Sequence, residues 1–418
     1  MILNDSYRTL SVCFFTSTIM NWHKSLNKAW QCFYKKKKVS GEEITSNLIS
    51  FAENYQTRIA VIKRHLQRRD YNFGKWRAVL IPKKDGGKRP LVVPSTISDK
   101  LVLKAISDYL SNELSNLFSS VGSISYAYQK GKSTRDALIR LKKMHNPENV
   151  LLKIDIMHFF DDIDRIILIQ LLEQYPIDDY VKELINKSIN PTVDYSKLGK
   201  DDIDKFPKGG IPQGNPISAV LSNLYLYGLD RLAISKGWKM VRYADDMVLS
   251  VSNIEDAQII LSQIDNYLFA SRKLTIHPLG KTSDSKTSIF SNVKKNRMEY
   301  LGVIFDGQNL FPTKACIHNL VEKVKKILKR TSTSEEKEIA IKRAIAQWCG
   351  YYAFTDISDR QIKGINNSIN HQLKKCNIQQ VDITDCILKA RKRQSRHLIK
   401  LFRLTKFGEE YDWLNIYS

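Results

Sequence analysis

Two adjacent acidic residues stand in the middle of an apolar stretch of this chain. The segment from Val241 to Val251 reads as strand, turn, strand, and Asp245 and Asp246 occupy the turn. Adjacent carboxylates repel each other, and apolar surroundings strengthen the repulsion because they exclude the water that would weaken it. A bound divalent cation would relieve this cost. The alternative is an ordinary hairpin with a solvated acidic tip, and the Asp-Asp pair alone does not exclude it.

A third carboxylate closes another apolar run. Val150 to Ile156 is short and nearly continuous in apolar residues, which is typical of a buried strand, and it carries Asp155 near its end. If the two strands are neighbours in one sheet, Asp155, Asp245 and Asp246 converge at one edge with the hard oxygen ligands that Mg²⁺ prefers. Such a cluster can hold two metal ions about 4 Å apart and catalyse nucleotidyl transfer.

The net charge of the chain points to a polyanionic partner. The 418 residues include 66 Lys and Arg against 43 Asp and Glu, a formal net charge of +23. A field of this sign attracts nucleic-acid phosphates, although a merely soluble basic protein or a membrane-surface binder would share it. Hydrophobic residues make up 43% of the chain, which excludes a permanently disordered protein. The length predicts two or three lobes.

Cysteine spacing and the N-terminal segment bear on location. The six cysteines form no CxxC pair, so we expect reduced thiols in a cytoplasmic protein. The segment from Ser11 to Met20 is too short to span a bilayer and follows Asp5 instead of a basic leader. We therefore expect neither export nor membrane insertion.

Strand and helix patterns alternate up to about Leu310, and only helical patterns follow. We expect helices before Asp70, a hairpin around the turn at Gly86, and a second hairpin from Tyr300 to Phe305. Apolar residues at every third or fourth position predict the other helices. These are Ser98 to Phe118, Asp136 to Lys143, Ile217 to Ala233, Ile254 to Leu268, Cys316 to Lys329 and Glu335 to Phe354.

Six segments occur in the order in which one enzyme family carries its motifs. They are Ile81 to Leu91, Tyr126 to Ser133, Asp155 to Phe160, Gly210 to Ser218, Tyr243 to Asp246 and Tyr300 to Phe305. Together they resemble the motif set of bacterial reverse transcriptases related to group II introns, retrons and diversity-generating retroelements. The resemblance implies an α+β right-hand polymerase with fingers, a palm of antiparallel sheet and helices, and a helical thumb.

The same resemblance implies a division of the chain into five parts. An N-terminal helical extension would span 1–75 and the fingers 76–150. The palm, with finger elements interleaved, would span 151–312. The helical thumb would follow over 313–380, and a basic helical tail over 381–418.

The resemblance assigns the chemistry to the three carboxylates. Asp155, Asp245 and Asp246 would be the catalytic residues. Together with Ile156 they would hold two Mg²⁺ ions, for which Mn²⁺ could substitute.

Residues around the acids would bind the incoming nucleotide. Phe160 stands where the family places a ring that clashes with a 2′-OH; its alternative role is core packing, which Phe159 is expected to provide. Lys286 resembles the palm lysine that protonates pyrophosphate, with Lys281 as a rival. The nucleotide-binding residues expected from the resemblance are Lys83, Lys88, Arg89, Phe160, Gln213, Gly214 and Lys286.

Other residues would contact the primer and template. Leu301 and Gly302 would form the primer grip. We expect Trp348 in the core of the thumb, whereas the two tyrosines that follow it could pack in that core or lie along a duplex. The nucleic-acid contacts implied are Lys132, Tyr351, Tyr352, Arg391, Lys392, Arg393 and Arg396.

Departures from the family pattern indicate the kind of reverse transcriptase. Asn215 and Pro216 follow Gln213-Gly214, where intron enzymes prefer Ser-Pro and diversity-generating enzymes prefer Ser-Gln. We find no CxxC endonuclease cassette after the thumb and no retron thumb signatures. These departures resemble stand-alone "unknown group" reverse transcriptases of bacterial anti-phage defence, such as type 2 of the defence-associated enzymes, which copy a noncoding RNA.

The partners expected are therefore a noncoding RNA template, its cDNA product and dNTPs. We expect no membrane partner, and the sequence is compatible with an oligomer. A group II intron-type or diversity-generating reverse transcriptase is the first alternative. A catalytically silent, maturase-like RNA-binding factor and an RNA-templated RNA polymerase are the others. The template, the priming mode and the oligomeric state stay open.

Overall fold

The computed structural model describes residues 19–40, 45–82, 86–280, 285–291, 293, 295–329 and 333–404, and the side chains of these except 36–40 and 395–404. Predictions for Lys83, Lys281 and the side chain of Arg396 lie outside the described residues. The chain forms two compact units. The first contains 1–133, 152–251 and 255–288, and the second contains 134–151, 252–254 and 289–418. The five-part division stays a prediction.

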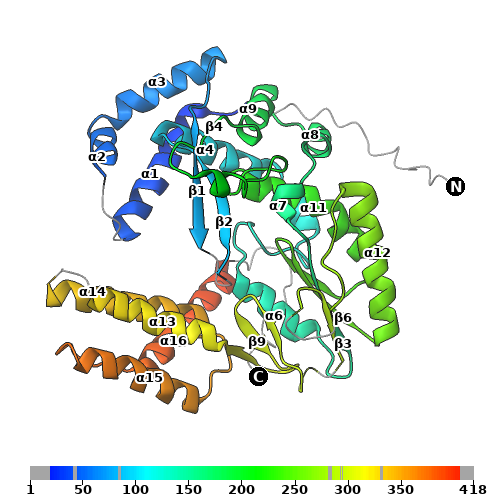
Figure 1. Cartoon of the computed structure of the whole chain (residues 1–418), viewed down its shortest axis with the longest axis vertical. Coiled ribbons are helices and arrows are strands. Elements are labelled where there is room, and N and C mark those ends of the chain that lie inside the picture. The colour runs from blue at the N-terminus through cyan, green and yellow to red at the C-terminus, as the bar shows by residue number, and fades with distance from the viewer. Residues whose placement is uncertain are drawn as a thin grey trace. The chain divides into compact units, whose positions relative to one another are not determined.

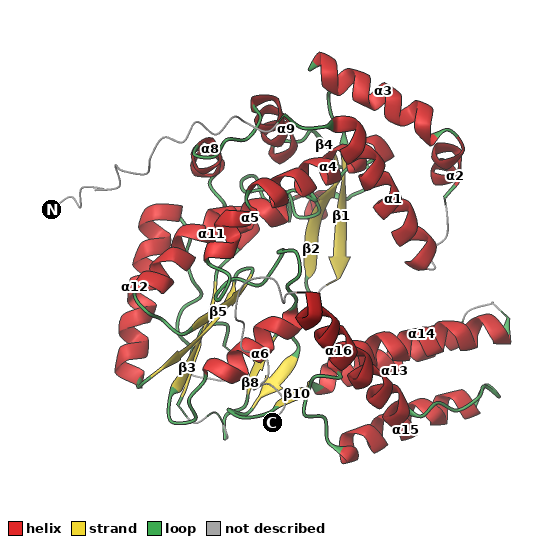
Figure 2. Ribbon diagram, turned by 180° about the vertical axis from the view of Figure 1, so that it is seen from behind, coloured by secondary structure: helices red, strands yellow, loops and turns green. Residues whose placement is uncertain are grey.

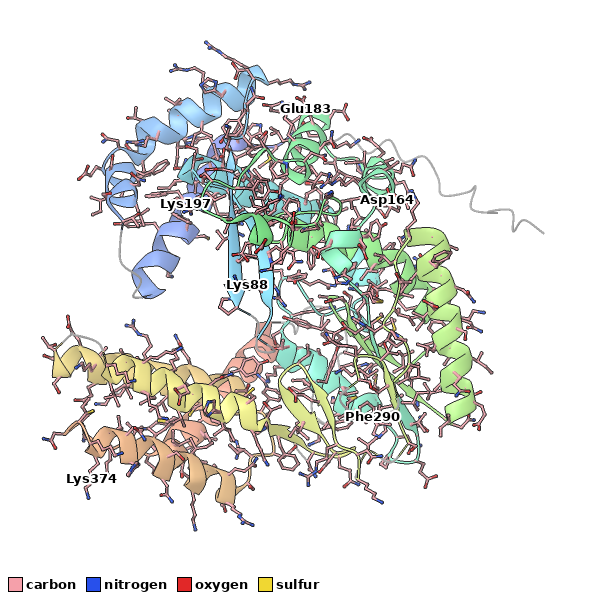
Figure 3. The ribbon with its side chains drawn as sticks, viewed as in Figure 1. Lys88, Asp164, Glu183, Lys197, Phe290 and Lys374 are labelled. Carbon is pink, nitrogen blue, oxygen red and sulfur yellow. The ribbon has the colours of Figure 1, made fainter. Side chains whose placement is uncertain are left out.

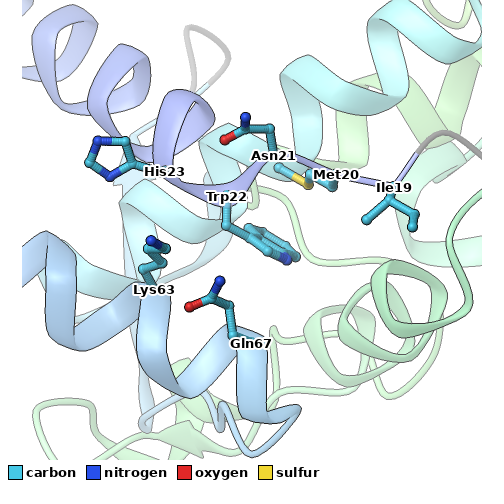
Figure 4. A pocket seen from close by; sticks show the side chains of 7 residues that line it. All are labelled: Ile19, Met20, Asn21, Trp22, His23, Lys63 and Gln67. Carbon is cyan, nitrogen blue, oxygen red and sulfur yellow. The ribbon is translucent and has the colours of Figure 1, made fainter.

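The first unit begins with the helices predicted before Asp70. They are α1 (Trp22–Ser40), α2 (Ser46–Glu53) and α3 (Tyr55–Arg68). Trp30 on α1 packs against the other two helices. Its ring centroid lies 5.0 Å from that of Phe51 on α2 and 5.7 Å from that of Tyr55 on α3. A pocket lies between the start of α1 and α3, and Figure 4 shows its lining. The residues are Ile19, Met20, Asn21, Trp22, His23, Lys63 and Gln67.

The predicted fingers hairpin is present. Strands β1 (Trp76–Pro82) and β2 (Lys88–Val93) pair antiparallel, with Pro82 opposite Lys88, and β4 (Val193–Asp194) pairs parallel with β1. Helix α4 (Ile97–Glu113) follows, and the side chain of Thr96 caps it by accepting from the Asp99 N–H. Helix α5 is Ser115–Ser120. The predicted helix from Ser98 to Phe118 is therefore two helices.

A four-stranded sheet carries the acidic residues. It consists of β3 (Val150–Asp155), β5 (Met240–Tyr243), β6 (Asp246–Val251) and β7 (Ser288–Phe290), in the order β5-β6-β3-β7. The strand that ends at Asp155 is thus the neighbour of the acidic hairpin, as predicted.

Helix α12 runs along this sheet (Figures 1 and 2). The apolar spacing correctly predicted α11 and α12, whose inner faces are buried. The helices are α7 (Phe159–Asp162), α8 (Arg165–Glu173), α9 (Asp179–Ile189), α10 (Lys200–Ile203), α11 (Ser218–Ser235) and α12 (Ile254–Arg272).

The second unit combines a small sheet with a helical bundle (Figure 2). The predicted second hairpin is present as β9 and β10, and β8 adds a strand, giving the order β10-β9-β8. Side chains of Thr333 and Ser358 cap α14 and α15 in capping boxes. The elements are α6 (Thr134–Met144), β8 (Met298–Tyr300), β9 (Val303–Phe305), β10 (Leu310–Pro312), α13 (Lys314–Leu328), α14 (Ser334–Tyr352), α15 (Asp359–Lys374) and α16 (Ile383–Leu404).

Two further findings concern the helices and the cysteines. Within the described residues, none of the helices combines the length and apolar character that crossing a membrane requires. The described cysteines are free thiols, and Cys13 lies outside the described residues.

Candidate active site

The acidic turn is a tight connection between β5 and β6. Tyr243 pairs with Asp246 at the end of the hairpin. Between them Ala244 adopts a left-handed backbone conformation with φ of 59°, which is uncommon for a residue with a Cβ. Ala244 is buried, and Asp245 and Asp246 are half-buried. The turn is therefore a constrained element and not the solvated tip of an ordinary hairpin.

The three carboxylates influence one another. Asp155 is only 8% exposed and ends the strand next to β6. Burial raises the pKa of Asp245, and the negative charge of Asp155 raises it further. Burial likewise raises the pKa of Asp246 to about 7, with added repulsion from Asp155 and Asp245. Asp155 and the acidic turn therefore lie close enough for their charges to interact, and their role as a joint metal site stays a prediction.

Lys286 provides the positive charge of the site. Its ammonium lies 2.8 Å from Oδ2 of Asp155, and this hydrogen bond raises the pKa of Lys286. Its neighbour Thr287 is held to the same strand end, because the Asp155 N–H donates to Thr287 Oγ1 at 3.4 Å. This placement is compatible with the role predicted for Lys286, whereas its rival Lys281 lies outside the described residues.

His277 is a site residue that the sequence reasoning missed. Its Nε2 lies 3.7 Å from Oδ2 of Asp155, and its backbone N–H donates to the Asp155 carbonyl at 2.9 Å. Burial lowers the pKa of this imidazole, so the ring is neutral near pH 7. A single histidine with no neighbouring motif carried no signal in the sequence.

The donor atoms suit divalent cations, although the carboxylates are not arranged as a finished coordination sphere. Among the described residues, no three His, Cys, Asp or Glu side chains form a group ready to hold a metal ion. Asp155 is instead bound to Lys286. Ile156 could offer only its backbone carbonyl, and its backbone bridges that of Ile276. The carboxylate chemistry fits Mg²⁺ or Mn²⁺, and binding would require Asp155 to exchange its lysine partner.

The loop before α11 approaches the fingers hairpin. The Val92 N–H donates to the Gln213 carbonyl at 2.8 Å, and the Gln213 side chain donates to Asp161 Oδ1 at 3.0 Å. Gly214 has φ of 108°, and a Cβ there would lie 2.8 Å from a Val93 methyl carbon. The close contact with β2 therefore requires glycine at this position. The sequence had instead suggested that glycine lets the backbone approach the nucleotide and the template.

The two phenylalanines beside the loop differ in burial. Phe159 is buried, and Phe160 is half-buried with its ring 5.3 Å from that of Phe159. The Phe160 carbonyl accepts from the Ile211 N–H at 2.8 Å. The core position of Phe159 is confirmed, and the sugar contact of Phe160 stays a prediction.

The basic residues of the hairpin differ in their surroundings. Arg89 is exposed, and its positive charge offsets part of the rise that burial causes in the pKa of Asp245 and of Tyr128. Lys88, labelled in Figure 3, pairs instead with Asp202 at 3.0 Å. Among the described residues of the hairpin, Arg89 is therefore a cation that interacts electrostatically with the acidic turn.

Residues predicted to grip the primer form a turn in the second unit. Leu301 and Gly302 connect β8 to β9 with φ of 51° and 77°. The Cys316 thiol donates to the Gly302 carbonyl at 3.2 Å, which ties this turn to the start of α13.

Two predicted nucleic-acid contacts have internal partners. The Lys132 ammonium donates to the carbonyls of Gly122 and Ser125 at 2.6 and 2.8 Å. Arg391 donates to the carbonyls of Ala353 and Thr355 at 2.9 and 3.0 Å. Both residues stabilise their own units, and any phosphate contact must compete with these bonds.

Tyr352 takes the core position, one of the two roles left open for it. Its side chain is buried, with the residue 7% exposed, and its ring lies 4.7 Å from that of Trp348, so it belongs to the core of the helical bundle of the second unit. Trp348 is itself in the core, as predicted. Tyr351 is 38% exposed, and Lys392 and Arg393 are exposed, so these three stay candidates for nucleic-acid contact.

The end of β3 and the neighbouring β5–β6 turn bring three carboxylates close to Lys286. This arrangement is typical of the palm of nucleotidyltransferases. A family model described as reverse transcriptase (RNA-dependent DNA polymerase) matches residues 81–305. This span is more than half of the chain, and the chain belongs to that family. The match confirms the predicted α+β right-hand polymerase fold, and the family implies dependence on divalent metal.

Relatives come from introns and retrons. The chain is 28% identical over 224 residues to the group II intron-encoded protein LtrA of Lactococcus lactis subsp. cremoris, covering 53% of this chain and 35% of the relative. It is 27% identical to the retron Ec48 reverse transcriptase of Escherichia coli over 274 residues. That match covers 62% of this chain and 61% of the retron enzyme. The chain thus spans about a third of the intron protein's length.

A solved structure of telomerase from Candida tropicalis, in complex with a fragment of telomeric RNA, also matches. Its TM-score is 0.45 at 14% identity, covering 77% of this chain and 61% of that one.

Proposed function

We propose that the chain is an RNA-directed DNA polymerase that copies a structured noncoding RNA into cDNA and serves in bacterial anti-phage defence. The observation that carries the polymerase activity is the convergence of Asp155 with Asp245 and Asp246 in a chain of the reverse transcriptase family. A protein that only bound RNA would gain nothing from burying three mutually repelling acids.

The three carboxylates would hold two Mg²⁺ ions. Bound there, the ions would activate the primer 3′-hydroxyl and stabilise the charge on the leaving phosphate. Lys286, whose pKa is raised, would hold a proton at Nζ for the pyrophosphate oxygen. Arg89 would attract the triphosphate, because a guanidinium binds phosphate bidentately. Phe160 would exclude ribonucleotides through the bulk of its ring.

The defence role and the noncoding RNA template rest on the sequence departures and the charge. A net charge of +23 favours a large RNA partner. Asn215, the departure from the intron pattern, is 5% exposed; it donates to the Ser188 carbonyl at 3.2 Å and accepts from the Ile217 N–H at 3.0 Å. This asparagine therefore supports the entry to α11 in a way that the shorter serine of intron enzymes could not.

Purified protein with its copurifying RNA, Mg²⁺ and labelled dNTPs tests the polymerase activity. We expect labelled DNA from the wild type and none from Asp245→Ala. Labelled DNA from both would remove the role of the carboxylates. No DNA from either, with RNA still bound, would leave the maturase-like binding factor, and ribonucleotide incorporation would identify an RNA polymerase.

Plaque assays test the defence role separately. Cells expressing the chain with its flanking DNA should resist at least one phage, and cells expressing Asp245→Ala should not. Sequencing the copurifying RNA should return one structured transcript encoded beside the chain. An active polymerase that protects against no phage, and that copurifies with spliced intron RNA, would favour the intron-type alternative.

A further inference from the structure

An arginine next to the acidic turn is completely enclosed. Arg242 precedes the turn by one residue and is 0% exposed. A guanidinium has five N–H donors, and each of the five has an acceptor. Two bond to Asp230 at 2.7 and 2.5 Å, and one each to Ser125 Oγ at 2.9 Å, Asn223 Oδ1 at 3.3 Å and the Ala244 carbonyl at 2.8 Å.

The partners come from separate parts of the first unit. Asp230 and Asn223 lie on α11, and Ser125 lies in the segment before Tyr128. The backbone of Arg242 joins that segment too, donating to the Ile124 carbonyl at 2.8 Å and accepting from the Tyr126 N–H at 3.0 Å. Through its side chain and backbone, a single residue thus connects α11, residues 124–126 and the turn.

The bond to Ala244 is the one that bears on the carboxylates. Ala244 is the left-handed residue of the turn, with φ of 59°, a conformation that a Cβ makes unfavourable. Its carbonyl orientation decides how the next residue, Asp245, leaves the turn. We propose that Arg242 is a positioning residue that holds the Ala244 carbonyl, and through it fixes the Asp245 and Asp246 carboxylates in the orientation that binds metal.

This inference rests on the proposed function, because it concerns the same carboxylates. Arg242 touches neither substrate nor metal in the proposal; it acts on the backbone that carries the ligands. A lysine could keep the charge beside Asp230 but could not hold Asp230 bidentately and reach Ala244 as well. The requirement is therefore for the guanidinium fork and not for a positive charge alone.

The test compares Arg242→Lys with the wild type in the full chain, using Mn²⁺ alone as the probe. Electron paramagnetic resonance of free Mn²⁺ gives the dissociation constant without substrate, and thermal unfolding in chelator gives the stability. We expect the Mn²⁺ dissociation constant to rise about tenfold or more, the effect typical of losing a residue that orients metal ligands. The Mg²⁺ concentration for half-maximal DNA synthesis should rise in parallel.

Arg272→Lys is the matched control. Arg272 also bonds to backbone carbonyls, of Tyr225 at 2.7 Å and Ser271 at 2.8 Å, but none of them belongs to the turn. We expect this variant to lose stability with an unchanged Mn²⁺ dissociation constant.

Outcomes separate the inference from the proposed function. If Arg242→Lys unfolds at a lower temperature but binds Mn²⁺ like the wild type, Arg242 is only a structural residue and the inference is wrong. If the wild type binds no Mn²⁺, the proposed function fails instead. If Arg242→Lys does not fold, Ser125→Ala replaces it, because this change removes one of the five hydrogen bonds of Arg242. We then expect the Mn²⁺ dissociation constant to rise by about two- to threefold. An unchanged dissociation constant would show that the inference is wrong.

Discussion

The ammonium of Lys286 donates a 2.8 Å hydrogen bond to Oδ2 of Asp155. The two residues differ in accessibility, because the lysine side chain is 66% exposed and the aspartate side chain 11% exposed. The lysine thus neutralises the carboxylate at the end of β3. If Asp155 held a metal ion, the Lys286 ammonium would be available to a phosphate oxygen.

Replacing Lys286 with Met should slow nucleotide incorporation by roughly 10²–10⁴-fold, the range for losing a general acid. Primer-template affinity should stay near that of the wild type, because the change removes only one exposed cation. Single-turnover incorporation of one dNTP measures the rate, and fluorescence anisotropy measures the affinity.

Lys273→Met is the control for this change. Lys273 pairs with Asp164 at 2.6 Å, and its side chain is 65% exposed, nearly the same as that of Lys286. An exposed ion pair contributes little, so this variant should keep its rate. Equal losses in the two variants would show that the rate depends on surface charge and not on the bond to Asp155.

Asp246 should make the metal-free protein less stable as the pH rises. Its pKa is raised from 3.8 to about 7 in the folded chain, chiefly by burial. The folded state therefore favours the protonated form, and the stability that this gives is complete below about pH 4 and lost as pH rises to about 7.

Asp246→Asn removes this dependence because the amide does not ionise. At pH 8 in chelator, the variant should exceed the wild type in unfolding free energy by up to about 4 kcal/mol, since one pKa unit corresponds to about 1.4 kcal/mol. Near pH 4 the two should be similar. Urea unfolding across this pH range measures the difference, and two parallel curves would contradict the prediction.

The acidic site could be predicted because its signals are local. Asp155 ends an apolar run, and Asp245 and Asp246 interrupt one, so each violates the pattern of its own strand. Arg242 and Asp230 gave no such signal, because their pairing depends on how α11 packs against β5, and a single charge in a sequence reads as a surface residue. The same holds for His277.

The burial of Tyr352 could have been predicted from the helical spacing of its sequence neighbours. Its position continues the series Ile341, Ile345 and Trp348, at steps of four, three and four residues, which is the spacing of one helix face. All four are buried, whereas Tyr351, one position earlier, is 38% exposed. For Gly214 the sequence correctly predicted a position that requires glycine. It could not predict the reason, because the contact with Val93 depends on tertiary structure.

Phe160→Ala should let the enzyme accept ribonucleotides. If the Phe160 ring excludes the 2′-OH, its removal should raise the ratio of kcat/KM for CTP over dCTP by about tenfold or more, comparable to opening a pocket by several methylene groups. Phe160→Tyr keeps the ring and should keep the discrimination. A ratio that is unchanged in the Ala variant would assign Phe160 to packing against Phe159.

The neighbouring tyrosines of α14 should separate stability from nucleic-acid binding. Tyr352→Ala should lower the unfolding free energy by about 3–5 kcal/mol, because it removes a buried ring from the contact with Trp348. Tyr351→Ala removes a ring that is 38% exposed, and should change stability by less than about 1 kcal/mol.

If Tyr351 lies along the duplex, its removal should weaken primer-template binding by about tenfold, as expected for an aromatic ring that contacts a base or sugar. Thermal unfolding and anisotropy on the same preparations measure both effects. Tyr351→Phe keeps the ring and serves as the control for the lost hydroxyl. Full affinity in Tyr351→Ala would argue against Tyr351 and leave exposed basic residues of α16, such as Lys392 and Arg393, as the candidate contacts.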